Sequence, residues 1–516
     1  MKNRLLILIA AFGILFQNSC SKFLEPKSEN EFVPTNVSSL DEMLLYEVYY
    51  KQSRNIFGYL NLMSDDIATI PVGNSTGVFA PYSAAAIKAI YSWQPNIYNQ
   101  LITERVYESE YDLYSQPYEK ILGCNAALDY LHTVEGTQAQ KDRVEAQARA
   151  LRAFYYFHLV NCFGQPYNHD KSSMGVPLKL NSAVSDVQIT RNSVEEVYEQ
   201  VLKDLLRAEE LFAGLPAEEQ WKADTRVSLP FTQLMLSRVY LYMEEWQKAS
   251  DMAQLVLDNE TFRLLDWSEL PWPEVGNPVN TYFNFHSYEN PEAIWVYGDV
   301  AEATNFAGTF TYNTSSQMVA FVIASDELLE ALGDDGLADV RKYQYVVQDF
   351  NSVNKKGYGK VAVDANYFPI QENNFGRSLR LPEAYLNKAE AEAMLWKEGA
   401  AASHGDTAWD LIQELREKRC RWLDLHPDTR PTSADELVEF VREERRREFC
   451  MEEHRWFDLR RYGMPEIRHR WTDSDGTVTT YTLKEHDPQY TLPIPPEVIE
   501  QNPALVQNPL GPIREN

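Results

Sequence analysis

The chain of 516 residues is long enough to bury a large core, and its composition, 44% hydrophobic and 24% charged, is typical of a globular protein. Its 76 acidic and 48 basic residues give a formal net charge of -28, which argues against nucleic acid and against an electrostatic hold on anionic lipid. Any attachment to a membrane must therefore come from something other than a basic patch.

The N-terminus has the pattern of an export signal. Two basic residues precede an apolar run from Leu5 to Phe16, which is too short to span a bilayer but suits a secretory signal peptide. Ser19 and Cys20 then resemble the end of a bacterial lipobox, in which cleavage before the cysteine is followed by its acylation, although Gln17 stands where an aliphatic residue is usual. We predict a signal peptide over residues 1–19 and lipidation of Cys20, with an ordinary signal peptide as the alternative.

A polar tether follows the cysteine. Residues 20–36 contain few apolar side chains and two prolines, Pro26 and Pro34. A segment of this composition lets a folded body sit above a lipid surface to which Cys20 is attached. The folded body is expected to occupy residues 37–516.

Helical periodicity recurs along this body. Ser193 and Glu196 form a capping box at the start of one helix, and alanines such as Ala253 and Ala389 alternate with large apolar residues, as in tetratricopeptide hairpins. Residues 55–96, which include Asp65, Asp66 and Trp93, are expected to be rich in loops. The expected helices span residues 40–50, 111–131, 142–163, 193–211, 229–257 as a hairpin, 382–395 and 407–419.

Residues 258–380 lack a strong helical period and are rich in Asn, Gly, Thr, Tyr and Phe. Short alternating segments such as Ala293 to Tyr297 are expected to be small strands. A stretch of this length without regular helices is uncommon in a compact protein unless it has a function. We therefore expect inserted binding loops in this region.

The segment from Glu443 to Gly463 alternates arginines with acids and has an apolar stripe of Phe449, Trp456 and Phe457. The pattern predicts one amphipathic helix whose charges pair three or four residues apart. Its nearly balanced charge does not suit a phosphate-binding face. The chain after Gly463 is expected to be loop-like and to end in a Pro-rich strap over the body.

Motifs for catalysis or metal binding are not evident in the sequence. Cys124, Cys162, Cys420 and Cys450 are widely separated and have no histidine at metal-ligand spacing, so no metal or cofactor is expected, and their pairing is left open. His158 is interpreted as a core residue, and the Asp473 to Gly476 segment as a surface turn. Carboxylate pairs for glycoside hydrolysis leave no local motif, so that alternative stays open.

Several motifs, in order along the chain, are similar to those of the SusD/RagB family of nutrient-binding lipoproteins. They are the Cys20 lipobox, EAQARALRAFYYFHLVNCFGQPY at 145–167, RNSVEEVYEQVLKDLLRAEELF at 191–212, SRVYLYMEEWQKA at 237–249, NPEAIW at 290–295, LRLPEAYLNKAEAEA at 379–393, RREFCMEEHRWFDLRRYG at 446–463 and LPIPPEVIEQNPALVQNP at 492–509. The resemblance implies an all-α fold of about four tetratricopeptide-like hairpins that support a loop-rich ligand face with minor β-structure.

The resemblance also implies a function. A protein of this family is expected to lie on the cell surface, anchored in the outer membrane through acylated Cys20, and to be a non-enzymatic partner of a SusC-like, TonB-dependent transporter. Its ligand would be an oligosaccharide or polysaccharide, with a peptide as the alternative. A surface glycoside hydrolase and a structural adaptor remain as further hypotheses.

The family motifs are scaffold, so they do not identify the ligand site. We expect this site to draw on the loops around residues 65–100 and 260–320. The candidates are aromatic rings for stacking and an adjacent amide: Trp93, Trp272, Tyr282, Asn284 and Tyr312.

Overall fold

The computed structural model describes most of the chain. The described residues are 34–50, 59–69, 84–103, 113–184, 187–270, 284–299, 310–312, 318–320, 322–333, 339–348, 356–358, 360, 373–421, 423, 427–473 and 475–514. Predictions for Cys20, Trp272 and Tyr282 therefore lie outside the described residues.

Long helices make up the first half of the described chain. Its helices are α2 (Val37–Met43), the π-helical η2 (Leu44–Val48), η3 (Leu60–Met63), α3 (Ala84–Tyr91), α4 (Ile97–Thr103), α6 (Ser115–Tyr130), α7 (Gln138–Phe163), α8 (Tyr167–Asp170), α9 (Val194–Ala213), α10 (Ala217–Gln220), α11 (Leu229–Tyr242) and α12 (Trp246–Leu257). The predicted capping box of α9 is confirmed: the Ser193 hydroxyl accepts from the Glu196 amide, and the Glu196 carboxylate accepts from the Ser193 amide.

The second half mixes helices with short strands. Its helices are η4 (Trp267–Glu269), α14 (Asp326–Ala331), α15 (Arg341–Gln344), α16 (Leu381–Lys397), α17 (Ser403–Glu417), α18 (Ala434–Phe449), α19 (His454–Arg461), η5 (Pro488–Tyr490) and α20 (Pro496–Gln501).

The strands form antiparallel pairs: β1 (Ile67–Thr69) with β5 (Val322–Ala324), β2 (Ala293–Tyr297) with β8 (Arg377–Arg380), β3 (Phe310–Tyr312) with β4 (Met318–Ala320), β6 (Val346–Gln348) with β7 (Lys356–Tyr358), and β9 (Ile467–Thr472) with β10 (Val478–Leu483). The expected strand at Ala293 to Tyr297 is thus confirmed as β2.

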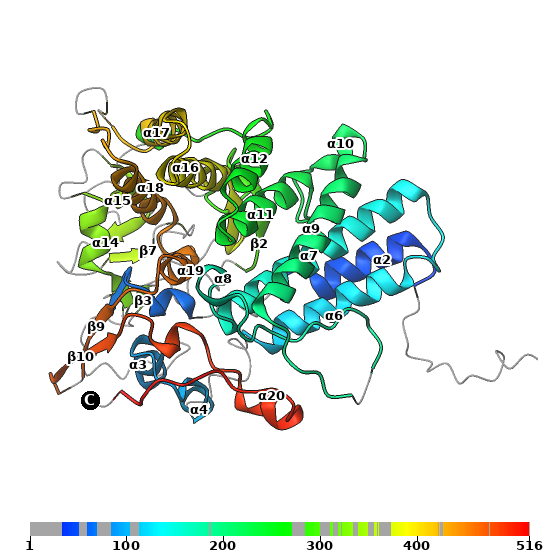
Figure 1. Cartoon of the computed structure of the whole chain (residues 1–516), viewed down its shortest axis with the longest axis horizontal. Helices are drawn as coiled ribbons and strands as arrows, with labels where there is room; N and C mark the ends of the chain where they lie inside the picture. The colour runs from blue at the N-terminus through cyan, green and yellow to red at the C-terminus, as the bar shows by residue number, and fades with distance from the viewer. Residues whose placement is uncertain are drawn as a thin grey trace, which may run out of the picture.

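The long helices pack in sequence. Helix α6 packs on α7, α7 on α9, α9 on α11, α11 on α12, and α12 on α16, which also contacts α17 and α18. Figure 1 shows this succession crossing the molecule, with α3, α4, β9, β10 and α20 along one side. Ala249, Ala253, Ala389 and Ala393 are fully buried where these helices approach closely. The predicted fold, mostly helical with tetratricopeptide-like hairpins and minor β-structure, is confirmed.

The prediction of a single helix from Glu443 to Gly463 is wrong. Helix α18 ends at Phe449, and α19 begins at His454, because Met451 and Glu453 adopt left-handed backbone angles (φ 62° and 61°). Other segments satisfy the interrupted backbone. The Asn61 side chain donates to the Met451 carbonyl and accepts from the Glu453 amide, both at 3.1 Å, while the Lys360 ammonium donates to the Cys450 carbonyl at 3.0 Å.

The prediction of a loop after Gly463 is also wrong, because β9 and β10 form a regular hairpin. In β9, Ile467, His469 and Trp471 are buried while Arg468 and Arg470 are exposed, which is the period-two pattern of a half-buried strand. The residues from Asp473 to Gly476 occupy the turn of this hairpin, where the Asp473 carbonyl accepts from the Gly476 amide at 2.9 Å. Their interpretation as a surface turn is confirmed. Similarly, α3 and β1 lie within residues 55–96, where loops were expected.

The Pro-rich tail crosses the body as expected. Leu492 and Ile494 are buried, and the Leu492 amide donates to the Cys162 carbonyl at 2.9 Å. The Asn508 side chain donates to the Phe163 carbonyl at 2.9 Å. Both contacts satisfy carbonyls in the last turn of α7, which have no partner within the helix. Nearby, Cys162 and the other three described cysteines are buried and free.

Ala389→Leu tests the close approach of the helices. Ala389 belongs to an apolar cluster between α16, α17 and α18 that also contains Ile412 and Val441. A larger side chain has no room there, so we expect the free energy of unfolding to fall by about 1–3 kcal/mol. Urea unfolding measures the loss. The control is Ala213→Leu, at an exposed position at the end of α9, and it should change the free energy of unfolding by less than ~0.5 kcal/mol. Equal losses in the two variants would contradict the close packing proposed at Ala389.

Candidate functional site

The predicted ligand residues do not form one described site. Trp272 and Tyr282 lie outside the described residues. Tyr312 ends β3, where its backbone pairs with Met318 of β4. Asn284 is half-buried, and its side-chain amide donates to the Glu289 carboxylate five residues on.

Trp93 belongs to the core. It is 1% exposed, its indole nitrogen donates to the Met63 carbonyl at 2.9 Å, and its ring stacks on His469 with centroids 4.1 Å apart. His469 stacks on Tyr91 through its other face, at 3.9 Å. In this arrangement Trp93 has no ring face open to a ligand. It joins β9 to the segment that precedes α4.

The segment that contains Trp272 and Tyr282 is fixed at both ends. On one side, the Arg421 guanidinium donates to the Ser268 carbonyl at 2.8 Å and also to the Leu270 carbonyl. On the other side, Phe285 is 1% exposed and packs on Trp267 with ring centroids 5.5 Å apart. Both stems of this segment therefore stand on the core.

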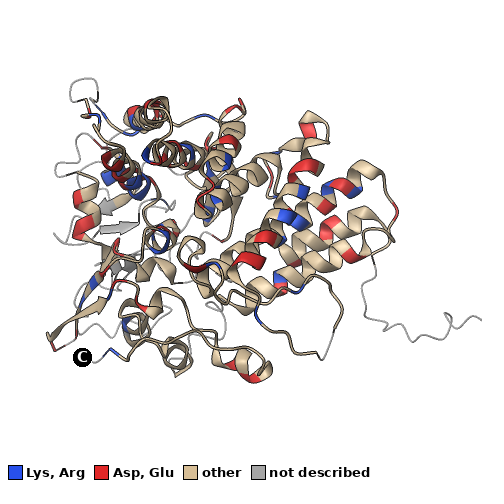
Figure 2. Ribbon diagram, in the orientation of Figure 1, with Lys and Arg blue, Asp and Glu red and all other residues tan. Residues whose placement is uncertain are grey.

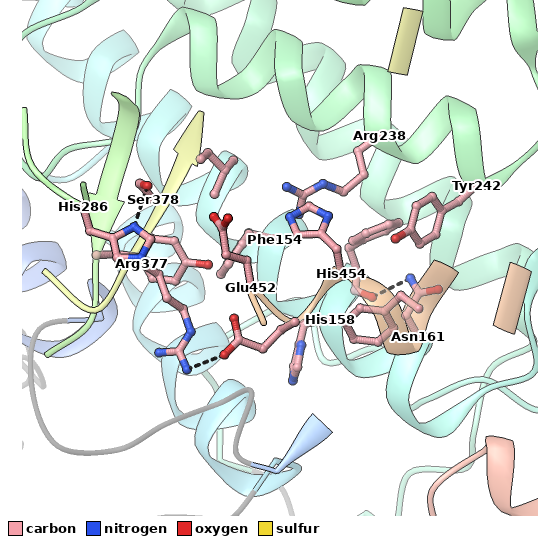
Figure 3. Close-up of a pocket in the computed structure, with 15 residues that line it drawn as sticks. Phe154, His158, Asn161, Arg238, Tyr242, His286, Arg377, Ser378, Glu452 and His454 are labelled. Atoms are coloured by element: carbon pink, nitrogen blue, oxygen red, sulfur yellow. Dashed lines mark hydrogen bonds and ion pairs between the residues drawn. The ribbon is translucent and has the colours of Figure 1, made fainter. Parts of the chain in front are cut away.

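A polar cavity lies beside these stems (Figure 3). Its volume is about 40 Å³, enough for a few water molecules but far below the size of ordinary small-molecule sites. Helices α7 and α11, strands β2 and β8, and the α18–α19 connection supply its walls. The charged or titratable side chains that line it are His158, Arg238, His286, Arg377, Glu452, Glu453 and His454.

His158 comes from the buried face of α7 and is 3% exposed, which confirms its interpretation as a core residue. Its ring lies edge-on to Phe457, with centroids 6.2 Å apart.

The two glutamates of the cavity face cations. Glu453 accepts from the Arg377 guanidinium at 3.0 Å, an interaction that Figure 3 marks with a dashed line. Glu452 accepts from the Arg380 guanidinium at 2.7 Å and from the Lys360 ammonium. Carboxylates engaged in this way serve as structural counter-ions rather than as a free acid and base pair.

Two histidines of the cavity, His286 and His454, are held neutral. Burial, together with Arg380, Lys360 and Arg377, places the pKa of His286 well below its usual value, and its Nδ1 lies 2.8 Å from the Ser378 hydroxyl. Burial and the nearby Arg238 likewise place the pKa of His454 well below the usual value. His286 and His454 therefore add no charge to the cavity at neutral pH.

Behind the cavity, Glu448 of α18 is the centre of a buried ion network. Its carboxylate accepts from Arg380 at 2.8 Å, from Arg419 at 2.9 Å and from Arg341 at 3.2 Å. The Tyr345 hydroxyl donates to it at 3.1 Å. Burial alone would raise the pKa of Glu448, but the three guanidinium groups hold it well below the usual range.

Neighbouring carboxylates extend the network. Glu292 accepts from Arg419 at 2.7 Å and from Arg380 at 3.2 Å. Glu444 forms an ion pair with Arg341 at 2.7 Å and accepts from Arg416 at 2.8 Å. The side chains of both glutamates are fully buried. The network thereby joins α18 to the starts of β2, α15 and α16 and to the end of α17.

A second group of buried ion pairs joins α19 to α16. Arg461 contacts Glu390 at 2.6 Å and Asp458 at 2.8 Å, and Arg445 of α18 contacts Asp458 at 3.1 Å. Burial opposes ionisation of Glu390, yet Arg461 and Arg442 lower its pKa to about 2. Of these contacts, only the Arg461–Asp458 pair has the expected helical spacing. Three of the six arginines in the 443–463 segment, Arg446, Arg455 and Arg461, pair with acids outside it.

Sequence reasoning missed this network because its members are far apart in the chain. Glu292, Arg380 and Glu448 nonetheless lie within three of the motifs quoted above: NPEAIW, LRLPEAYLNKAEAEA and RREFCMEEHRWFDLRRYG. The position of these residues within the quoted motifs was the signal in the sequence that could have pointed to the network. Among the described residues, no group of three or more His, Cys, Asp or Glu is placed to hold a metal ion.

Two sequence models of protein families match most of the chain. One, described as "Starch-binding associating with outer membrane", matches residues 22–241, and the other, described as "SusD family", matches residues 363–510. The chain belongs to the SusD-like family. The second match includes Arg380, Arg419 and Glu448, whereas Glu292 and Arg341 of the ion network lie outside both matched ranges.

Curated SusD-like proteins match along much of their length. "SusD-like protein P2" of Formosa agariphila is 27% identical over 441 residues, which cover 76% of this chain and 79% of that protein. "SusD-like protein P25" of the same organism is 22% identical over 570 residues and covers 97% and 98% of the two chains.

Solved structures share the fold. A SusD superfamily protein from Bacteroides thetaiotaomicron has a TM-score of 0.68 and 21% identity and covers 92% of this SusD-like chain and 100% of its own. A structure named "Laminarin binding SusD-like protein" has a TM-score of 0.60 and 22% identity and covers 92% and 99% of the two chains.

Glu448→Gln tests the network. The change removes the charge that three buried arginines share, so we expect the free energy of unfolding to fall by about 3–5 kcal/mol. Denaturant unfolding measures the loss. The control Glu439→Gln removes an exposed carboxylate of the same helix, which is paired with Arg442 at 3.3 Å, and should cost less than ~0.5 kcal/mol. A loss below 1 kcal/mol for Glu448→Gln would contradict the account.

The lowered pKa of His286 predicts how the free energy of unfolding depends on pH. The folded protein keeps His286 neutral, whereas the unfolded chain takes up a proton near pH 6.5. The neutral His286 therefore makes its full contribution to the free energy of unfolding above about pH 6.5. This contribution is lost as the pH falls below about 6.5, by up to ~1.4 kcal/mol per pH unit. His286→Asn should flatten the profile of unfolding free energy between pH 7.5 and pH 5, measured against wild type and the exposed-histidine control His132→Asn. Parallel wild-type and His286→Asn profiles would refute the assignment.

Proposed function

We propose that this protein is a cell-surface lipoprotein that captures oligosaccharide or polysaccharide and passes it to a SusC-like, TonB-dependent transporter in the outer membrane. The observation that carries the proposal is its membership of the SusD-like family, one of whose matching sequence models is described as starch-binding and associated with the outer membrane. A fold neighbour named for laminarin binding also supports a glycan ligand.

The ligand face belongs to the loops between α12 and α16. The segment that contains Trp272 and Tyr282 begins and ends on residues packed in the core, and Tyr312 ends a paired strand. A loop on fixed stems can present aromatic rings at a defined spacing, which suits stacking against sugar rings. The half-buried amide of Asn284 would add a hydrogen bond beside these rings.

Lipidation of Cys20 would anchor the protein. Acyl chains hold a protein to a bilayer by burying CH₂ groups, which does not require a basic surface. This mode of attachment fits a chain with a net charge of -28. Among the described helices, none combines the length and the apolar content that crossing a membrane requires.

Peptide binding is the first alternative, and a surface glycoside hydrolase is the second. Glycosidases need a carboxylic acid and a carboxylate that flank the scissile bond. In the polar cavity, Glu452 and Glu453 instead pair with cations, and the volume of about 40 Å³ does not admit a sugar ring. These observations argue against glycoside hydrolysis in this cavity.

Affinity electrophoresis and calorimetry of the protein starting after Cys20 test the proposal. The panel contains plant, host and microbial glycans together with peptides. We expect retardation by one polysaccharide and at least a tenfold loss of affinity in Trp272→Ala, Tyr282→Ala or Tyr312→Ala, because one lost stacking contact is worth about 1.4 kcal/mol or more.

Tyr46→Ala is the matched control. Tyr46 is 84% exposed on η2 and is not part of the proposed loops, so this variant should bind like wild type. Binding of peptides alone, or release of reducing ends from the retained polysaccharide, would support the corresponding alternative instead.

A further inference from the structure

A second cavity lies where α14, the end of α17 and α18 meet, and we name it the α14–α18 cavity. Its volume is about 330 Å³, at the lower end of the range of ordinary small-molecule sites and well above the 40 Å³ of the polar cavity. Helix α18 lies between α17 and α14 in Figure 1 and packs against both. The side chains that decide its chemistry are Asp339, Arg416, Arg421, Asp428, Phe440 and Arg447.

The charged walls of the α14–α18 cavity are held in place by the protein itself. Arg416 donates to both oxygens of the Asp428 carboxylate, at 2.5 and 2.9 Å, and to Glu444 at 2.8 Å. Arg447 donates to Glu444 at 2.9 Å and to the Ala331 carbonyl at 3.3 Å. Because these guanidinium groups are fixed before a ligand arrives, binding would cost little side-chain entropy.

Positive and negative groups interlock around the α14–α18 cavity. Three guanidinium groups and three carboxylates pair there: Arg341, Arg416, Arg447, Asp339, Asp428 and Glu444. Burial alone would raise the pKa of Glu444, but the three arginines hold it well below its usual value. Figure 2 shows acidic and basic positions together on α18.

This mixture of walls favours a neutral polar ligand. An anion would meet the carboxylates of Asp339 and Asp428 as well as the arginines, and a cation would meet the arginines. A hydroxyl group both donates and accepts hydrogen bonds, so it can donate to a carboxylate and accept from a guanidinium group. A ligand with several hydroxyl groups therefore suits the α14–α18 cavity better than a charged one.

Phe440 supplies an aromatic wall. Its half-buried ring packs on Trp409 with centroids 5.5 Å apart, and the guanidinium carbons of Arg416 and Arg447 lie 5.7 and 5.9 Å from its centre. Leu332, which is 1% exposed, adds an apolar surface. An aromatic ring beside fixed polar groups is a combination that suits sugars, whose rings have apolar C–H faces and polar edges.

Arg421 connects the α14–α18 cavity to the proposed ligand loops. It lines the cavity, and its guanidinium donates to the Ser268 carbonyl at 2.8 Å and also to the Leu270 carbonyl. Trp272 follows Leu270 by two residues, which span at most about 7 Å. The segment that contains Trp272 therefore leaves the frame close to a residue of the cavity wall, so one glycan chain can reach both.

We propose that the α14–α18 cavity is a subsite for one neutral pyranose ring of the glycan. Arg447 and Asp428 bind its hydroxyl groups, and Phe440 packs against its C–H face. The proposal rests on the proposed glycan-binding function, in which the loops between α12 and α16 bind the rest of the chain.

The test titrates single sugars into the mature chain, made soluble by Cys20→Ser. The probes are the methyl glycosides of glucose, galactose and mannose, with glucuronic acid as a charged comparison, and saturation-transfer NMR measures binding. Ala331→Trp places a large ring at the cavity wall, and Arg447→Lys keeps the positive charge beside Glu444 but removes the planar guanidinium. The matched control is Ala213→Trp, which also changes the last residue of a helix but is exposed.

We expect at least one neutral glycoside to bind wild type and Ala213→Trp equally, and to bind both cavity variants about fivefold more weakly or worse. Thermal melting shows that each variant is folded, and Arg447→Lys stands in if Ala331→Trp does not fold. Unchanged binding in the folded cavity variants, stronger binding of glucuronic acid, or no binding of any neutral glycoside would overturn the proposal.

Retardation by polysaccharide reports the proposed function separately. If a polysaccharide retards wild type and Ala331→Trp equally, and the glycosides do not distinguish them, the subsite fails while the proposed function stands. If the glycosides bind at the α14–α18 cavity and no polysaccharide retards the protein, the subsite stands and the proposed capture of polysaccharide fails.

Discussion

One buried carboxylate, Glu448, constrains the rest of the structure. It is the common partner of Arg380, Arg419 and Arg341, and the network that continues through Glu292 and Glu444 joins segments from five parts of the chain. Removing charges from water is costly, and the pairing offsets this cost only when each partner is in place. The arrangement therefore specifies how α18 sits against β2, β8 and the end of α17. Three of these residues, Arg380, Arg419 and Glu448, lie within the range that the SusD family model matches.

The frame and the proposed ligand loops have different physical roles. Helices α6 to α18 pack through small side chains and buried ion pairs, which leave little freedom for change. The loops between α12 and α16 begin and end on this frame at residues such as Phe285 and Trp267. A rigid frame lets loop sequences vary without loss of the fold. The small polar cavity belongs to the frame, because its glutamates are counter-ions and its volume suits water.

The sequence predicted what depends on local patterns. The helix around residues 193–211 carries strong apolar periodicity and begins at the expected Ser193 capping box, while the helix around residues 142–163 is an apolar run buried on nearly all sides. The break between α18 and α19 was not predictable, because Asn61 and Lys360 stabilise it from distant parts of the chain. Strand β9 was missed, although the alternation of Ile467, His469 and Trp471 with polar residues is visible in the sequence. Trp93 was predicted as a ligand platform, yet His469, more than 370 residues away, covers one of its faces. Of the other candidates, the described residues place only Asn284 and the backbone of Tyr312.

The central claim is that a rigid, ion-paired frame holds loops that bind glycan, and hydrogen–deuterium exchange with and without a bound oligosaccharide tests it most directly. The account predicts that amides of α16 and α18 exchange only through global unfolding in both states. It predicts that ligand slows exchange within residues 260–320. Fast exchange of α18 in the free protein, or protection on binding that falls on the helical array and spares residues 260–320, would contradict it.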